Sequence, residues 1–165
     1  MQTLAISLLF LACGGTGAML SRAMTLRTRE LELCLQMVAQ IRAQLQFSRP
    51  PVQRMLEALC EQSQHPAFLP RVLVGVQTGV EFPKAWRAAI QEQRGGLKED
   101  DRRHLLALGE LLGASDAAGQ REALALQESL LATQLDQARD LRDTRGKAFF
   151  MLGILAGLTV MILFL

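Results

Sequence analysis

The sequence contains few of the residues on which many enzymes and secreted scaffolds depend. Its 165 residues include one Trp, two His, three Cys and no Tyr. The Cys residues are odd in number and show no CxxC or CxxH spacing, which excludes a disulfide scaffold and argues against a zinc site. We expect reduced, buried thiols, with Cys13 in an apolar segment and Cys34 and Cys60 at apolar helix positions.

Charge is absent from both ends of the chain. Every Lys, Arg, Asp and Glu lies between Arg22 and Lys147, which leaves residues 1–21 and 148–165 uncharged. A net charge of +2 over the central residues is too small to indicate binding of nucleic acid. The hydrophobic content of 50% excludes a disordered chain. We therefore expect a polar central domain, residues 22–147, between two apolar segments.

The C-terminal segment, residues 148–165, is predicted to be a transmembrane helix. Thr159 is its only polar side chain. At about 1.5 Å per residue the segment spans roughly 27 Å, close to the hydrocarbon thickness of a bilayer. A buried core helix is the alternative, but such helices rarely lack a polar face over five turns.

The N-terminal segment, residues 1–21, is predicted to be a second transmembrane helix. It lacks the basic n-region of a signal peptide, although the small residues between Ala12 and Ala18 would also suit a cleavage site. A lipid anchor at Cys13 is disfavoured because bulky residues precede it. An uncleaved anchor is the preferred interpretation.

The basic residues that flank the two segments predict their orientation. By the positive-inside rule, the central domain faces the cytoplasm and both termini face the other side of a cell membrane. The cations after the first segment are Arg22, Arg27 and Arg29, and those before the second are Arg139, Arg142, Arg145 and Lys147. The two segments agree independently, which indicates a multi-pass protein with two spans.

Small residues recur four apart inside both predicted spans. This spacing puts small residues on one helix face and lets two helices approach closely. The helices so paired are either the two spans of one chain or spans of different subunits, as in a homo-oligomer, although Gly is also common in membrane helices. The pairs are Cys13 with Gly17, Gly14 with Ala18, and Gly153 with Gly157. The candidate packing residues are the glycines of these pairs, Gly14, Gly17, Gly153 and Gly157.

The central domain is predicted to be all-α. Apolar residues recur at spacings of three and four up to Phe47, where Ser48–Pro51 ends the first helix. Further helices are expected to begin near Val52, at Pro66, at Pro83, at Glu99 and at Ala117, with ends at Gly79 and at Gly95–Gly96. The last helix is expected to continue into the second span, with Gly146 as the easiest place to bend. No stretch alternates as a strand would. The expected fold is a membrane-anchored helical bundle with N- and C-terminal transmembrane helices.

The polar residues of the sequence show no clear pattern of a catalytic, metal-binding or phosphate-binding site. His65 and His104 are far apart and have no metal-ligand spacing. The acidic run Glu99–Asp101 suits the positive end of a helix dipole better than an acid/base pair or a cation site. The pair Gly95–Gly96 lacks the flanking residues of a phosphate loop. We expect no catalytic residue, no metal and no cofactor.

Several motifs together resemble one family of membrane proteins. They are the Pro50–Pro51 break after Phe47, Ala85–Trp86, the block from Leu97 to Gln120 with Glu99–Asp100, Gly109, Leu112–Gly113 and Ser115–Asp116, and the stretch Lys147–Gly157. The chain resembles the stage III sporulation protein AB family over nearly its whole length. It departs from the family pattern at Arg49–Pro50–Pro51, where a small hydroxyl residue before a single Pro would be expected.

The resemblance implies a role in endospore formation. Family members are non-enzymatic components of the channel-like assembly that links mother cell and forespore after engulfment. The domain resembles the cytoplasmic domain of the type II secretion inner-membrane platform. The implied partners are a mother-cell ATPase, stage III sporulation protein AA, and other channel subunits. The candidate partner-contact residues are Asp100, Asp116 and Gln120, although Asp116 also suits a helix cap and Gln120 a buried hydrogen bond.

Two other functions are compatible with the pattern. A general type II secretion or pilus-type inner-membrane platform protein would have similar helices, but such proteins usually carry two copies of the domain. A membrane-bound enzyme or metal-dependent regulator would need a cluster of polar residues, which the sequence does not show.

Overall fold

A computed structural model of the chain is built from helices. It describes residues 2–47, 50–93, 96–113 and 117–146, with isolated positions beyond residue 147. Within the first helix, side chains are described at Met19 and from Ser21 to Gln46. Every regular element in the described ranges is helical, which confirms the predicted all-α fold.

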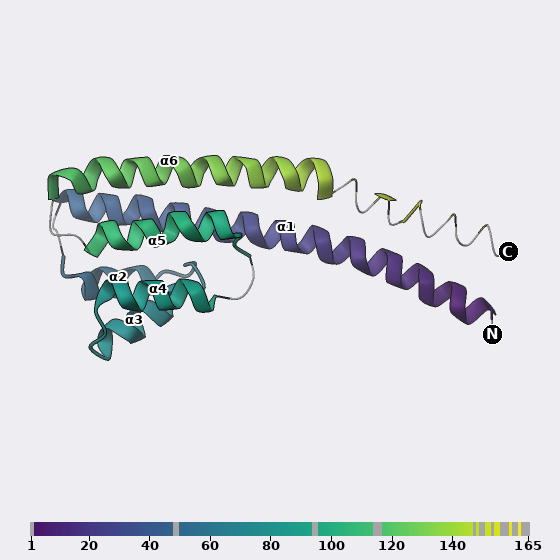
Figure 1. Ribbon diagram of the computed structural model, residues 1–165, viewed down its shortest axis with the longest axis horizontal. Helices are drawn as coiled ribbons and strands as arrows, with labels where there is room; N and C mark the ends of the chain where they lie inside the picture. The colour runs from purple at the N-terminus through teal and green to yellow at the C-terminus, as the bar shows by residue number, and fades with distance from the viewer. Residues whose placement is uncertain are drawn as a thin grey trace.

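The longest helix, α1 (Gln2–Phe47), runs the length of the molecule (Figure 1). Its apolar stripe is fully buried at Leu31, Cys34, Val38 and Ile41. The prediction of one continuous helix to Phe47 is confirmed, and the helix ends before the Pro50–Pro51 pair because proline disfavours helix in the residue before it.

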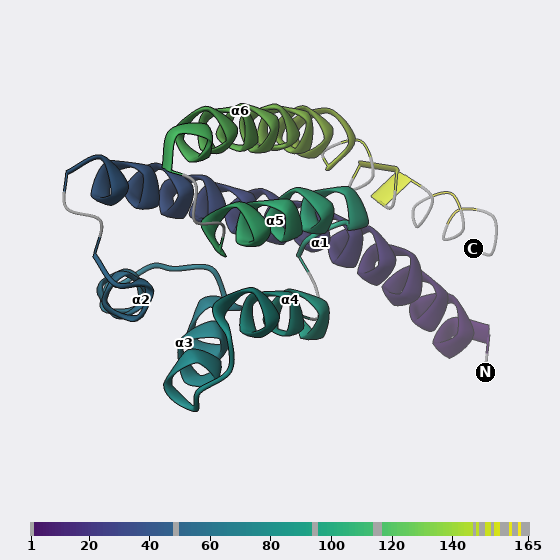
Figure 2. The same ribbon diagram turned by 60° about the vertical axis from the view of Figure 1, so that its left-hand side comes forward.

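The second long helix, α6 (Ala117–Leu141), lies beside α1 in both Figure 1 and Figure 2 and runs antiparallel to it. Its buried stripe comprises Leu124, Leu131, Leu135 and Ala138. A π-helical segment, η1 (Arg142–Gly146), follows directly and also contacts α1. The predicted continuation of the last helix is confirmed as far as Gly146, although residues 142–146 take the wider turn of a π-helix.

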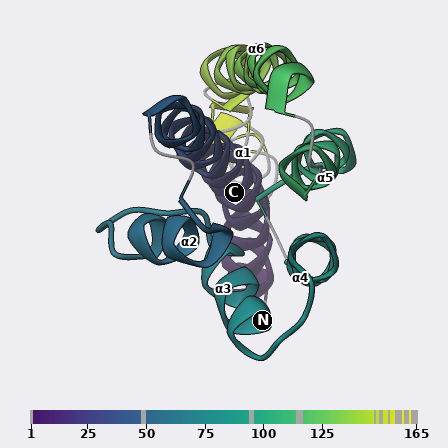
Figure 3. The same ribbon diagram turned by 90° about the vertical axis from the view of Figure 1, so that its left-hand side faces the viewer.

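Four shorter helices complete a ring around the core. They are α2 (Val52–Cys60), α3 (Leu69–Gln77), α4 (Phe82–Glu92) and α5 (Glu99–Gly113). Seen end-on, the order α1, α6, α5, α4, α3, α2 passes round the bundle, and each helix contacts the next (Figure 3). This arrangement buries the apolar face of every short helix.

Trp86 of α4 is the largest fully buried side chain in the described part of the chain. It is 1% exposed, and its Nε1 donates a hydrogen bond to the Leu105 carbonyl of α5 at 2.7 Å. The Phe68 ring meets the indole edge-on, with centroids 5.2 Å apart. Gly109 of α5 lies against the indole so closely that a Cβ there would overlap it. The glycine thus lets α4 and α5 approach around the largest core side chain.

Proline and glycine mark the ends of the short helices, mostly as predicted. Gly79 ends α3 with φ of 88°, and Pro83 lies in the first turn of α4. The expected helix start at Pro66 is wrong: α3 begins at Leu69, and Pro70 occupies its first turn. Either proline suits a first turn, because the missing N–H has no partner there in any case.

The structure describes the backbone of the first predicted span but only isolated positions of the second. Residues 2–20 form the start of α1, and among residues 148–165 only isolated positions are described. Gly14 and Gly17 lie in the helical backbone of α1, whereas Gly153 and Gly157 lie outside the described residues. In the part of the chain that the structure describes, no helix combines the length and the apolar character needed to cross a bilayer. Helix packing through these glycines stays a prediction.

Candidate functional site

A buried ion pair joins two helices that are distant in sequence. Arg27 of α1 donates from Nε to Asp101 Oδ2 and from Nη2 to Asp101 Oδ1, both at 2.8 Å. Arg27 is 7% exposed and Asp101 is fully buried. This two-bond geometry matches the planar guanidinium to the carboxylate and fixes the relative position of α1 and α5.

Two further hydrogen bonds extend this pair. Gln134 of α6 accepts from Arg27 Nη2 at 3.2 Å, so three helices meet at the Arg27 cluster, defined as Arg27, Asp101 and Gln134. Asp101 Oδ2 also accepts from the Lys98 backbone N–H at 2.8 Å, which is the reciprocal half of a capping box at the start of α5. The cluster therefore fixes a helix start and a three-helix junction together.

The electrostatics of the Arg27 cluster favour a structural role. The hydrogen bonds to Asp101 raise the pKa of Arg27 above its ordinary value, although burial opposes the shift. A guanidinium with a raised pKa stays charged at physiological pH and does not exchange protons. The cluster is suited to holding helices in place and not to acid/base catalysis.

Sequence reasoning assigned the run Glu99–Asp101 to helix-start electrostatics and missed this pairing. Glu99 and Asp100 are exposed and lie in the first turn of α5 as expected, but Asp101 is buried against Arg27. The spacing of the two charges relative to nearby apolar residues could have indicated the pairing. Arg27 lies one turn before Leu31 and Asp101 one turn before Leu105, so each charge continues a buried apolar stripe. A charge on a buried face requires a partner of opposite sign.

The three predicted partner-contact residues are not brought together by the described structure. Asp100 is exposed and pairs with Arg103 one turn later on α5. Asp116 lies outside the described residues, and Gln120 lies in the first turn of α6 with its side chain outside the description. Their contact with a partner stays a prediction.

The histidines and cysteines show no arrangement for chemistry in the described ranges. No group of three or more His, Cys, Asp or Glu side chains there could hold a metal ion. Cys34 and Cys60 are free thiols, but only Cys34 is buried as predicted, since Cys60 is half-buried. The side chain of Cys13 lies outside the description. Burial raises the pKa of the Cys34 thiol well above its usual range, and the charge of nearby Glu30 adds to the effect. The thiolate needed for a nucleophile is therefore disfavoured at Cys34.

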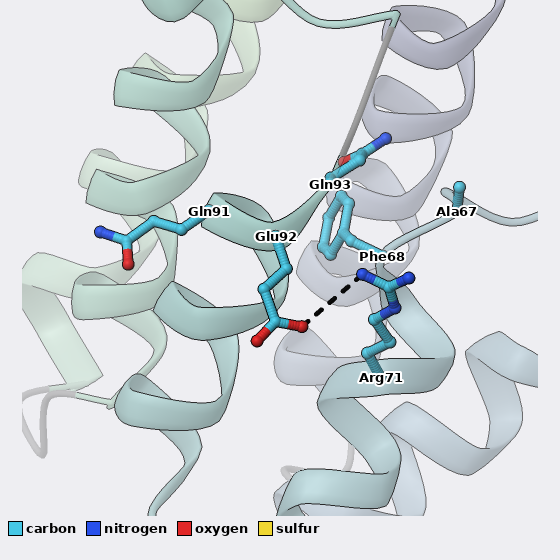
Figure 4. A pocket seen from close by; sticks show the side chains of 6 residues that line it. All are labelled: Ala67, Phe68, Arg71, Gln91, Glu92 and Gln93. Carbon is cyan, nitrogen blue, oxygen red and sulfur yellow. Dashed lines mark ion pairs between the residues drawn. The ribbon is translucent and has the colours of Figure 1, made fainter.

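A polar recess of about 550 Å³, the α3–α4 groove, opens between two short helices (Figure 4). Arg71 and Glu92 lie across from each other there, with 3.7 Å between Nη1 and the carboxylate. Gln93 donates from Nε2 to Glu30 of α1 at 3.3 Å, while its buried Oε1 has no hydrogen-bond partner in the described structure. The groove presents the exposed side chains of Arg71 and Glu92, one of each charge, which makes it a candidate contact surface.

Together these features define a class of protein: a helical domain built around two long antiparallel helices, in which buried polar groups join the helices. Comparison with protein families is more specific. The family model of stage III sporulation protein AB matches residues 2–165, and the chain belongs to this family. Membership confirms the resemblance noted in the sequence and is consistent with a role in sporulation. No curated protein and no solved structure matches the chain.

Proposed function

We propose that the chain is a non-enzymatic membrane component of the channel-like assembly that links mother cell and forespore after engulfment. The observation that carries this proposal is the shared exit of the two long helices. Glu32 of α1 accepts from Arg139 Nη2 of α6 at 2.8 Å, and η1 continues along α1 beyond that point. The predicted spans therefore leave the bundle from the same end, so one bilayer would receive both.

The distribution of exposed apolar side chains supports membrane anchoring. Six of the ten large apolar side chains that are exposed among the described residues lie within the two predicted spans. They are Met19, Met151, Leu152, Ile154, Leu155 and Ile162. Exposed apolar side chains that are clustered at one end of a protein indicate contact with lipid or with another protein. Single exposed apolar side chains are common on any protein surface.

The cations near the exit support a cytoplasmic domain. Arg22 and Arg29 of α1 are exposed just after the first predicted span, and Arg142 begins η1 just before the second. Under the positive-inside rule this end faces the mother-cell cytoplasm. There the bundle would meet the ATPase stage III sporulation protein AA and other channel subunits, for which the α3–α4 groove and Asp100 are exposed candidate contacts.

The test is deletion of the gene in the spore-forming host, scored by heat-resistant spore counts and membrane-dye microscopy. We expect forespores that complete engulfment and then stall or shrink, and rescue by the full chain. Normal spore yield after deletion would overturn the proposal. Loss of protein export without a sporulation defect would instead favour a general type II secretion or pilus-type platform.

A second experiment tests the partner contact. The ATPase is captured on the full chain in detergent, using wild type, Asp100→Asn and Asp136→Asn. Asp136 is a matched control because it is an exposed carboxylate on α6 that also pairs with an Arg one turn later. We expect weaker capture only for Asp100→Asn. Equal capture by all three chains would remove Asp100 from the contact.

A further inference from the structure

An apolar cavity of about 340 Å³, the end cavity, lies at the end of the bundle from which the long helices leave. Its walls come from three parts of the chain that are distant in sequence: α1, α6 and the connection between α4 and α5. The residues that matter most are Met24, Arg27, Leu97, Lys98, Ala138 and Leu141. Most of these are apolar, and the two cations lie among them.

The end cavity lies where the membrane surface would be. Its α1 residues, Ala23 and Met24, directly follow the predicted first span, and Leu141 is the last residue of α6 before η1 leads toward the second span. Along the apolar part of the lining, formed by Met24, Leu97 and Leu141, an apolar occupant is favoured over water because it removes apolar surface from water. At a bilayer surface the available apolar occupant is an acyl chain.

Two cationic groups at the cavity have unused hydrogen-bonding capacity. Arg27 Nη1 makes no hydrogen bond to any described residue, although Nε and Nη2 are engaged by Asp101 and Gln134. The exposed Lys98 ammonium forms no ion pair within the described ranges, and the adjacent carboxylates of Glu99 and Asp100 pair with arginines of their own helix. Because Asp101 neutralises Arg27, Lys98 supplies the uncompensated positive charge among the described residues that line the end cavity.

From this combination we infer that the end cavity binds one anionic phospholipid. An acyl chain lies along Met24, Leu97 and Leu141, and the phosphate meets the Lys98 ammonium and Arg27 Nη1. The position between two membrane-entering helices favours a lipid over a peptide, and the positive charge favours an anionic headgroup over a zwitterionic one. The inference rests on the membrane anchoring proposed above.

The test is native mass spectrometry of the full chain released from mixed micelles that contain equal amounts of phosphatidylglycerol and phosphatidylcholine. Wild type is compared with three variants: Lys98→Glu removes the cation, Ala23→Phe fills the cavity from an exposed position, and Lys84→Glu is a matched charge change on α4. Fluorescence of Trp86, the only Trp, reports whether each chain is folded.

We expect wild type and Lys84→Glu to retain one phosphatidylglycerol in preference to phosphatidylcholine. Retention should fall by about fivefold or more in Lys98→Glu, the effect of one cation near an anionic lipid, and also in Ala23→Phe. Equal retention of both lipids, or equal behaviour of Lys98→Glu and Lys84→Glu, would overturn the inference. Displacement of the lipid by millimolar inorganic phosphate would overturn it too, since a free anion site would then explain the binding.

Carbonate extraction of membranes from the expressing cells separates this inference from the proposal on which it rests. If the chain stays in the membrane but retains no phosphatidylglycerol, only the lipid site is wrong. If the chain is released into the soluble fraction, the membrane anchoring fails and the lipid site fails with it.

Discussion

Removing one partner of the Arg27–Asp101 pair should destabilise the bundle strongly. In Arg27→Met, the fully buried Asp101 carboxylate keeps only its hydrogen bond from the Lys98 N–H. Truncating one side of a buried ion pair costs about 3–5 kcal/mol of the free energy of unfolding, because the remaining charge is buried and unpaired. Such a loss is a large fraction of the stability of a small domain.

Removing both charges should restore much of that loss. In the double variant Arg27→Met/Asp101→Leu no charge is left unpaired, and apolar side chains of similar size occupy the site. Relative to wild type, the double variant should still lose about 1–2 kcal/mol of the free energy of unfolding. The main cause is that the Lys98 N–H and the Gln134 side chain each lose a hydrogen-bond partner. The double variant should therefore be more stable than Arg27→Met by about 1–4 kcal/mol.

The assay is denaturant unfolding of the full chain in detergent, followed by the fluorescence of Trp86, which is buried in the core. The control is the exposed ion pair of Arg103 with Asp100, the residue directly before Asp101 on the same helix. Arg103→Met should lower the free energy of unfolding by less than about 1 kcal/mol. A loss below about 1 kcal/mol for Arg27→Met, or a double variant less stable than the single one, would refute the reasoning.

Two further predictions concern the core. Gly109→Ala should lower the free energy of unfolding by about 1–3 kcal/mol because the added Cβ would overlap Trp86. At an open helix position the same substitution normally stabilises. A gain in stability in the same unfolding assay would show that the indole moves aside easily. Burial raises the pKa of the Cys34 thiol, so above about pH 9 the unfolded chain binds fewer protons than the folded chain. The free energy of unfolding therefore falls as pH rises, by up to about 1.4 kcal/mol per pH unit. Unfolding measured from pH 8 to pH 10 should show a steeper decline for wild type than for Cys34→Ala, and parallel curves would contradict the burial argument.

Much of the fold could be predicted because local signals mark it. The three-and-four spacing of apolar residues defines α1 up to Phe47, and the prolines and glycines around α4 and the end of α3 restrict backbone angles on their own. The start of α3 could not be decided in this way, because Pro66 and Pro70 satisfy the same local rule. The π-helical segment η1 has a sequence with no local feature that separates it from an α-helix, and we have no physical account of why it forms there.

The candidate site was less accessible to sequence reasoning. Arg27 and Asp101 are 74 positions apart, and each has an ordinary local explanation, as a flanking cation or as a helix-start carboxylate. Only the contact between α1 and α5 shows that the two charges share one buried location. The α3–α4 groove is similar: the unused Gln93 acceptor depends on the contact with Glu30 of α1, which no local pattern predicts.

The proposed function requires that two membrane-spanning helices display the bundle in the cytoplasm. This topology can be tested by labelling with a membrane-impermeant maleimide in intact cells that express the full chain without its native cysteines. One variant carries a single Cys at Gln2, before the first predicted span, and the other at Ser129, which is exposed on α6. With the bundle in the cytoplasm, we expect labelling at position 2 in intact cells and at position 129 only after the membrane is permeabilised. Labelling of position 129 in intact cells would contradict it.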